Sequence, residues 1–141
     1  MTIVEEGVSS VYAAPGQRGA VAEYRPRYGH YIGGEFVDPI KGQYFENVSP
    51  VTGKPFTEVG RGTVEDIDRA VDVAWKAFES WKRTSAAERA NILNKIADRI
   101  EQNLESIAVA ETWDNGKPVR ETLAADIPLV VDHFRYFAGV L

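Results

Sequence analysis

Cysteine is absent from the 141 residues of this chain, and histidine occurs only at positions 30 and 133. The lack of cysteine excludes disulfides, thiolate metal sites and a cysteine nucleophile from the chain. His30 falls in a predicted loop and His133 beside an apolar helical stripe. For both we expect a structural or solvent-facing role in preference to catalysis.

Long apolar runs and an excess of basic residues are also missing. No stretch approaches the roughly 18 consecutive apolar residues that span a bilayer, and the first residues lack the basic and apolar regions of a signal peptide. The formal net charge is −5, with no basic stripe. We therefore expect no membrane and no nucleic acid among the partners, and a cytoplasmic location.

Motifs that bind nucleotide phosphates are absent as well. The sequence contains no Gly-x-Gly-x-x-Gly, and Gly53-Lys54 lacks the surrounding residues of a phosphate-binding loop. The acidic residues near position 65 are explained by the start of a helix. We assign no catalytic and no cofactor-binding residue from composition and spacing.

The chain divides into an arm, a β element and a helical region. With 44% apolar residues it can form one modest core. Residues 1–27 lack periodicity and predict an extended or poorly ordered arm. Residues 28–62 predict a hairpin with its turn at Gly33-Gly34 and a second extended pair, 44–48 and 56–59. Pro50 and Pro55 favour loop or edge positions. Residues 63–141 are predicted to be helical.

The first helix is predicted from Thr63 to about Trp81. The Thr63 hydroxyl can cap the first turn, and Glu65 and Asp66 lie at the positive end of the helix dipole. Apolar residues at intervals of three and four form one stripe: Ile67, Val71, Ala74, Trp75, Phe78 and Trp81. We expect this stripe in the core, with Trp75 and Phe78 packed against Leu93, Ile96 and Ile100.

The second helix is predicted from Ser85 to about Trp113. Ser85 and Glu88 have the spacing of a capping box. The expected buried face consists of Leu93, Ile96, Ala97, Ile100, Leu104, Ile107 and Ala108.

The stretch Glu111–Pro118 predicts a helix end, a turn and a helix start, because Asn115-Gly116 tolerates positive φ and Pro118 suits a first turn. The helical pattern then continues, and Pro128 should break or kink it near Asp126. The chain ends at Leu141 without a polar cap, as in an interrupted protein. On these features alone, it is a soluble helical domain with a small β element.

Six segments, in order along the chain, match the pattern of one enzyme family: Tyr31–Val37, Ser49–Gly53, Ile67–Trp81, Arg89–Ile100, Glu111–Pro118 and Arg135–Gly139. From about Tyr31 onward, the chain resembles the N-terminal quarter to third of NAD(P)-dependent aldehyde dehydrogenases. Trp113 stands where the family pattern has leucine. The amino-acid sequence of residues 118–137 is similar to that of bacterial enzymes that act on small aliphatic aldehydes such as acetaldehyde.

The resemblance implies an α/β fold: the N-terminal part of the aldehyde dehydrogenase fold, mainly helical, with a small antiparallel β element before the helices. It also implies that a catalytic cysteine and glutamate, and NAD or NADP binding, belong to parts of the enzyme beyond this chain. The chain is then a C-terminally truncated fragment, inactive by itself. Its expected partners are the remainder of the enzyme or homologous subunits in a homo-oligomer, and aldehyde only at full length.

The resemblance further implies a monovalent cation site. In many family members a structural cation lies between the aspartate of the Asp-Asn-Gly turn and oxygens of a preceding strand. The corresponding residues are Asp114, Asn47 and the backbone carbonyl of Val48, with Asn47 where threonine is common. The alternative role for Asp114 is to accept local backbone hydrogen bonds at the turn.

Two other functions remain open from the sequence. The helical stripes could belong to a stand-alone interaction module, which should be stable and monodisperse. The chain could also be a decoy subunit that assembles with full-length enzyme. A fragment with an exposed apolar patch would instead tend to associate.

Overall fold

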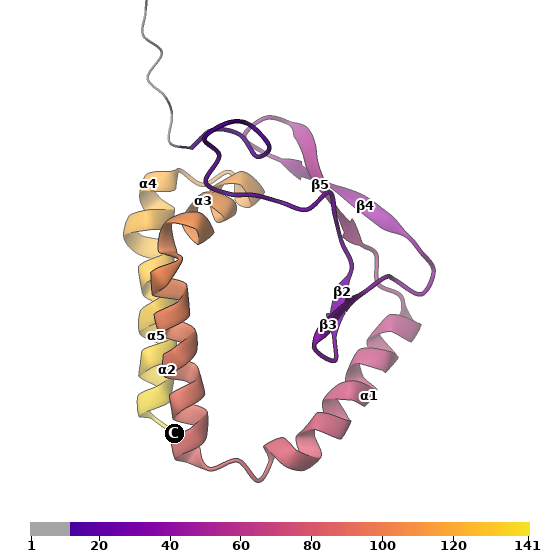
Figure 1. The fold of residues 1–141 in the computed structure, drawn as a ribbon, viewed down its shortest axis with the longest axis vertical. Helices are drawn as coiled ribbons and strands as arrows, with labels where there is room; N and C mark the ends of the chain where they lie inside the picture. Colours follow the sequence, from indigo (N-terminus) through magenta and orange to yellow (C-terminus); the bar gives the residue numbers. More distant parts are fainter. Residues whose placement is uncertain (1–11) are drawn as a thin grey trace, which may run out of the picture.

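The strands precede the helices along the chain, as predicted. The computed structural model describes residues 12–141, and it contains β1 (Arg27–Tyr28), β2 (His30–Ile32), β3 (Glu35–Val37), β4 (Tyr44–Ser49), β5 (Lys54–Gly60), α1 (Val64–Trp81), α2 (Ala86–Gln102), α3 (Leu104–Asn115), α4 (Val119–Glu121), the π-helical turn η1 (Thr122–Asp126) and α5 (Ile127–Gly139). In Figure 1 the sheet of β4 and β5 and helix α3 lie at one end, and α2 and α5 run together along one side. Helix α1 stands on the other side, with the β2–β3 hairpin between it and the sheet.

Both predicted β pairs are confirmed. Strands β2 and β3 form an antiparallel hairpin around Gly33-Gly34, in which Ile32 pairs with Glu35. Strands β4 and β5 are also antiparallel, with a register shift between Asn47 and Val48. The small antiparallel β element before the helices is therefore present.

The sheet also contains a parallel pair that sequence analysis missed. Strand β1 pairs with β5 through Arg27 and Tyr28, so the strand order is β1-β5-β4. Pro55 lies in β5, the central strand, but β1 reaches only Glu58 and Val59, so that β5 has a single neighbour at Pro55. The edge position expected for Pro55 is therefore confirmed at that residue.

Helix α1 forms where predicted, but its apolar stripe is not in the core. Trp75 is 64% exposed, and Ile67, Val71, Phe78 and Trp81 are exposed too. In the part of the chain that the structure describes, α1 makes no extensive contact with another helix. The predicted packing of Trp75 and Phe78 against α2 is therefore wrong. Amphipathic periodicity shows that a face needs a partner but does not identify the partner.

The predicted second helix is divided in two. The chain leaves helical geometry at Asn103, where φ is −116° and ψ is 20°, and α3 begins at the next residue. The Asn103 side chain donates to the Arg99 carbonyl at 2.8 Å. An asparagine that bonds the backbone in this way competes with the helix ladder, which explains the interruption.

The expected burial of this helical face is confirmed only in part. Ala97 and Ala108 are fully buried, whereas Ile96 is 37% exposed. Helix α5 packs along α2, and Arg135 joins the two through Asp98 at 3.2 Å and Glu101 at 2.6 Å. Val131 and Ala138 supply buried positions of α5.

The joint expected near Asp126 is present as a π-helical turn and not as a break. The Ile127 N–H bonds the Thr122 carbonyl, five residues back. Pro128, in the first turn of α5, has no N–H to donate. The wider turn lets the chain continue as a helix past the proline.

A small core lies around α3. Ala22, Val109 and Trp113 are buried together, and the partly buried residues packed on them are Tyr12, Ala14, Val21, Tyr24, Ala110 and Val119. Tyr24 packs edge-on to Phe56 with ring centroids 4.7 Å apart, and its hydroxyl donates to the Ala110 carbonyl at 2.8 Å. Burial raises the pKa of Tyr24 to about 12. Residues 12–26 thus contact the body.

The predicted division into an arm, residues 1–27, and a following domain stays a prediction. Residues 1–11 lie outside the described residues. Residues 12–26 contain turns and irregular structure.

Two tryptophans should differ sharply in their contribution to stability. Trp113 is 9% exposed and Trp75 is 64% exposed. We expect Trp113→Ala to lower the free energy of unfolding of this chain by about 3–5 kcal/mol, and the matched control Trp75→Ala to lower it by less than about 1 kcal/mol. Urea unfolding followed by circular dichroism measures both. Equal losses would contradict the described core.

Candidate functional site

The end of α3 is tied to strand β4, which brings two of the three predicted site residues together. The Asn47 side-chain amide donates to Asp114 Oδ1 at 2.6 Å. The Ser49 hydroxyl donates to the Trp113 carbonyl at 2.5 Å, and Ser49 is only 1% exposed. Sequence analysis missed Ser49, whose only signal was its place in the Ser-Pro turn.

The turn after α3 has the conformation expected from its sequence. Gly116 ends the helix with φ of +80°, and its N–H bonds the Thr112 carbonyl at 2.9 Å. A Cβ at this position would lie 2.9 Å from Pro50 Cβ. Glycine is therefore required both by the left-handed conformation and by the close approach of the β4–β5 turn.

The monovalent cation site stays a prediction. Asp114 lies at the negative end of the α3 dipole, which favours positive charge. Val48, whose backbone carbonyl is the third predicted ligand, follows Asn47 in β4. The side-chain amide of Asn47 donates a hydrogen bond to Asp114 Oδ1, so it would compete with a cation for that carboxylate. Within residues 12–141, no group of three or more histidine, cysteine, aspartate or glutamate residues is placed to hold a metal ion.

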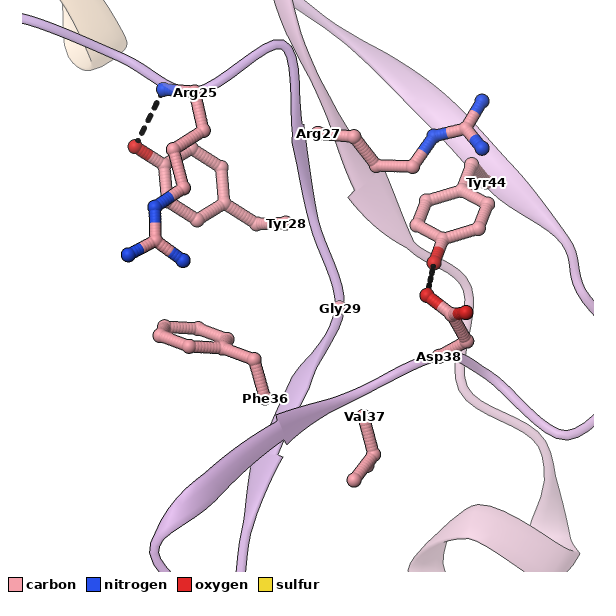
Figure 2. Close-up of a pocket in the computed structure, with 8 residues that line it drawn as sticks. All are labelled: Arg25, Arg27, Tyr28, Gly29, Phe36, Val37, Asp38 and Tyr44. Atoms are coloured by element: carbon pink, nitrogen blue, oxygen red, sulfur yellow. Dashed lines mark hydrogen bonds between the residues drawn. The ribbon is translucent and has the colours of Figure 1, made fainter.

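A shallow pocket lies where β1 and β3 meet the start of β4. Figure 2 shows the lining residues divided between two sides of the backbone at Gly29, with Arg25, Tyr28 and Phe36 on one side and Arg27, Tyr44 and Asp38 on the other. A Cβ on Gly29 would clash with the Val37 carbonyl, so glycine permits the strands to cross closely.

Most of the charges of this pocket are already paired. Arg27 bonds Glu58 through Nε at 2.8 Å and stacks over the Tyr44 ring at 4.1 Å. The Tyr44 hydroxyl donates to Asp38 at 2.6 Å, and this bond raises the Tyr44 pKa. The Tyr44 hydroxyl and the Asp38 carboxylate are thus engaged with one another, and we assign no catalytic role to this pocket.

The two histidines occupy different surroundings. His133 is exposed on α5, as expected. The loop predicted at His30 is wrong, because His30 begins β2 through its pairing with Val37. His30 Nε2 lies 4.0 Å from Asp66 Oδ1 and makes no hydrogen bond within the described residues.

Asp66 connects three segments at the start of α1. Its carboxylate accepts the Ile40 N–H at 2.9 Å and the Thr63 N–H at 2.8 Å. The Thr63 hydroxyl also donates to Asp66 at 2.9 Å, and the two residues form a capping box at the start of α1, which confirms the predicted cap at Thr63. Asp66 is 3% exposed, and these bonds, above all the one from Ile40, lower its pKa.

Comparison with known proteins identifies the protein family to which this chain belongs. The description of the matching family model is "Aldehyde dehydrogenase family", and the match covers residues 36–141. An acetaldehyde dehydrogenase from Pseudomonas aeruginosa is 68% identical over 131 residues, which are 93% of this chain and 26% of the relative. A probable aldehyde dehydrogenase from Streptomyces coelicolor is 65% identical over 92% of this chain and 26% of its own length.

Solved structures agree with these sequence matches. A putative aldehyde dehydrogenase from Burkholderia cenocepacia superposes with a TM-score of 0.79 at 37% identity, over 82% of this chain and 24% of that one. The NAD⁺ complex of an aldehyde dehydrogenase from Bacillus cereus gives 0.77 at 40% identity, over 84% and 26%. The chain belongs to the aldehyde dehydrogenase family, and it spans about a quarter of the length of these relatives.

The α/β fold class expected from the resemblance is thereby confirmed. Among the described residues, no helix is both long enough and apolar enough to cross a membrane.

Asp66 should make the stability of the chain sensitive to acid. Its folded pKa lies below the ordinary 3.8, so its contribution is fully present above that value and is lost as the pH falls through the folded pKa. We expect Asp66→Asn to lower stability at pH 6 and to flatten the decline below pH 4. Denaturant unfolding from pH 2.5 to 6 tests this, with exposed Asp68→Asn as control. A decline of unchanged steepness in Asp66→Asn would refute it.

Proposed function

We propose that this chain is the N-terminal part of an NAD(P)-dependent aldehyde dehydrogenase that oxidises an aldehyde to a carboxylic acid. The observation that carries the proposal is the 68% identity to an acetaldehyde dehydrogenase over 93% of this chain. The family match over residues 36–141 supports it.

The role of this part is to support a reaction whose chemical groups lie elsewhere. In the reaction that the family resemblance implies, a cysteine thiolate attacks the aldehyde and the nicotinamide accepts a hydride. This chain has no cysteine. The described residues bind no reacting atom in the proposal; they form a β element and helices against which the rest of the enzyme is built.

A small aliphatic aldehyde is the proposed substrate. The relatives named for a substrate include the acetaldehyde dehydrogenase at 68% identity, a fluoroacetaldehyde dehydrogenase from Streptantibioticus cattleyicolor at 59% and a long-chain-aldehyde dehydrogenase from an Acinetobacter species at 58%. The acetaldehyde dehydrogenase has the highest identity of the three, which favours an aldehyde with two carbons as the substrate. NAD is the proposed cofactor because the Bacillus cereus relative is known as an NAD⁺ complex.

The proposed partners are the remaining part of the enzyme and homologous subunits of a homo-oligomer, in the cytoplasm. The stand-alone module is less well supported, because α1 exposes a stripe that a monodisperse protein would be expected to cover.

Purified chain 1–141 should not reduce NAD in the presence of acetaldehyde, since it has no thiol for the covalent step. A chimera in which residues 1–141 replace the matching quarter of the Pseudomonas aeruginosa relative should reduce NAD, with the unaltered relative as control. Formation of reduced cofactor is followed by its absorbance. Turnover that copurifies stoichiometrically with chain 1–141 would overturn the proposed inactivity.

We further propose that Asp114, Asn47 and the Val48 carbonyl contribute to a monovalent cation site. Support comes from the place of Asp114 at the end of α3 and beside β4, and a bound cation would displace the Asn47 amide from Asp114 Oδ1. Hard oxygen ligands suit Na⁺ or K⁺. In this chain the site would hold the α3 turn against β4, and it takes no part in the chemical step.

The cation proposal predicts a salt-specific stability. The melting temperature of the chimera should be higher in potassium or sodium chloride than in choline chloride at equal ionic strength, by about 1 °C if binding contributes about 1 kcal/mol, because the entropy of unfolding grows with chain length. Asp114→Asn should remove the difference, and exposed Asp132→Asn should keep it. Equal melting temperatures of the unaltered chimera in all three salts would contradict the site.

A further inference from the structure

The turn at the end of α3 contains a residue pair with intrinsic chemical reactivity. Asn115 is followed by Gly116, whereas the other asparagines of the chain precede residues with bulky side chains: Val48, Ile92, Lys95 and Leu104. In an asparagine–glycine pair the glycine nitrogen can attack the asparagine side chain, because no Cβ shields that nitrogen and the backbone is least restricted there. Asn115 is therefore the asparagine of this chain most prone to deamidation.

The reaction needs only water besides the chain. The Gly116 nitrogen loses its proton and forms a bond to Asn115 Cγ, the bond from Cγ to Nδ2 breaks, and the side-chain nitrogen leaves as ammonia. Water then opens the resulting five-membered ring at either of its two carbonyls, which gives aspartate or isoaspartate. Asn115 and Gly116 are both exposed, so water reaches the pair.

The folded turn restrains both reacting groups. The Gly116 N–H donates to the Thr112 carbonyl at 2.9 Å, so attack requires this bond to break. The Asn115 side chain is fixed at two points, because Oδ1 accepts the Lys117 N–H at 2.8 Å and Nδ2 donates to Glu111 Oε1 at 3.2 Å. Asn115 is also the last residue of α3, and ring closure requires its backbone to leave the helical conformation. The closed turn therefore keeps Asn115 as an amide.

The end of β4 and the turn after it hold this helix end closed. The Ser49 hydroxyl donates to the Trp113 carbonyl at 2.5 Å, and a Cβ on Gly116 would lie 2.9 Å from Pro50 Cβ. We call these two contacts the α3–β4 junction. The last carbonyls of a helix lack partners within the helix, so the last turn of α3 frays when the junction opens.

Deamidation prevents the turn from closing again. The new carboxylate at position 115 has no N–H to donate to Glu111, and it lies beside Asp114 at the negative end of the α3 dipole, where negative charge is unfavourable. In isoaspartate the main chain runs through the side-chain carbons and is longer by one atom, which displaces the Gly116 N–H from the Thr112 carbonyl. The product thus favours the open junction.

We propose that Asn115-Gly116 is a latent modification site, which the α3–β4 junction keeps unreactive and which deamidates when the junction opens. The contacts that restrain the pair lie within this chain and do not depend on the proposed activity. Deamidation makes opening of the junction irreversible, and isoaspartate at position 115 marks the molecules in which it has opened.

Peptide mass spectrometry measures deamidation at each asparagine during incubation in neutral buffer. In chain 1–141 unfolded by urea, Asn115 should react faster than the other asparagines. In the folded chain, and in the chimera with the Pseudomonas aeruginosa relative, its rate should be lower by about tenfold or more, because only the locally opened fraction reacts.

Ser49→Ala tests the role of the junction. Loss of the bond to the Trp113 carbonyl should raise the rate at Asn115 in the folded protein by about fivefold. The matched control Ser80→Ala removes an exposed hydroxyl that donates to the Ala77 carbonyl in α1, and it should leave the rate unchanged. Circular dichroism shows whether each variant is folded. If Ser49→Ala does not fold, the milder Asn47→Ala, which removes the donor to Asp114 Oδ1, takes its place.

Three results would overturn the proposal. The first is an equal rate at Asn115 in urea and in buffer, in both the chain and the chimera, since the fold would then give no protection. The second is a folded junction variant that deamidates no faster than the unaltered protein. The third is another asparagine that reacts faster than Asn115 in urea. None of these readouts depends on turnover, so an inactive but folded chimera still tests the site.

Discussion

The arrangement of the whole chain depends on the contact between the last turn of α3 and strand β4. Here the Ser49 hydroxyl satisfies the Trp113 carbonyl, one of the carbonyls that the end of a helix leaves without a partner. Gly116 then turns the chain away beside Pro50. This contact joins the β element to the helical region, next to the small core around Val109 and Trp113.

Local structure was predictable because its determinants lie within a few residues of one another. The Gly33-Gly34 hairpin, the start of α2 at Ser85 and the left-handed end of α3 at Gly116 each follow from the conformational preferences of two to four residues. The joint before Pro128 was also predicted, and its π-helical form was not. The interruption at Asn103 needed knowledge of which backbone group its side chain would bond.

Long-range structure was predictable only where the family resemblance supplied it. The resemblance placed Asp114 near strand β4, and the structure pairs it with Asn47. Amphipathic spacing alone assigned Trp75 to the core, because a periodic stripe identifies a face and says nothing of what covers it. The contact of Asp66 with Thr63 follows a local rule, the capping box, but its contact with Ile40 joins residues 26 positions apart that no local rule connects.

The π-helical turn of residues 122–126 sets the rotational phase of α5. A bond from Ile127 to Thr122 encloses one residue more than an α-helical turn, and one residue corresponds to about 100° of rotation. With a regular turn in its place, Val131 and Ala138 would be rotated out of the seam with α2 and Arg135 would leave Asp98 and Glu101. The additional residue therefore acts as an angular offset, and deleting one residue from this turn would rotate α5 by about 100° relative to α2.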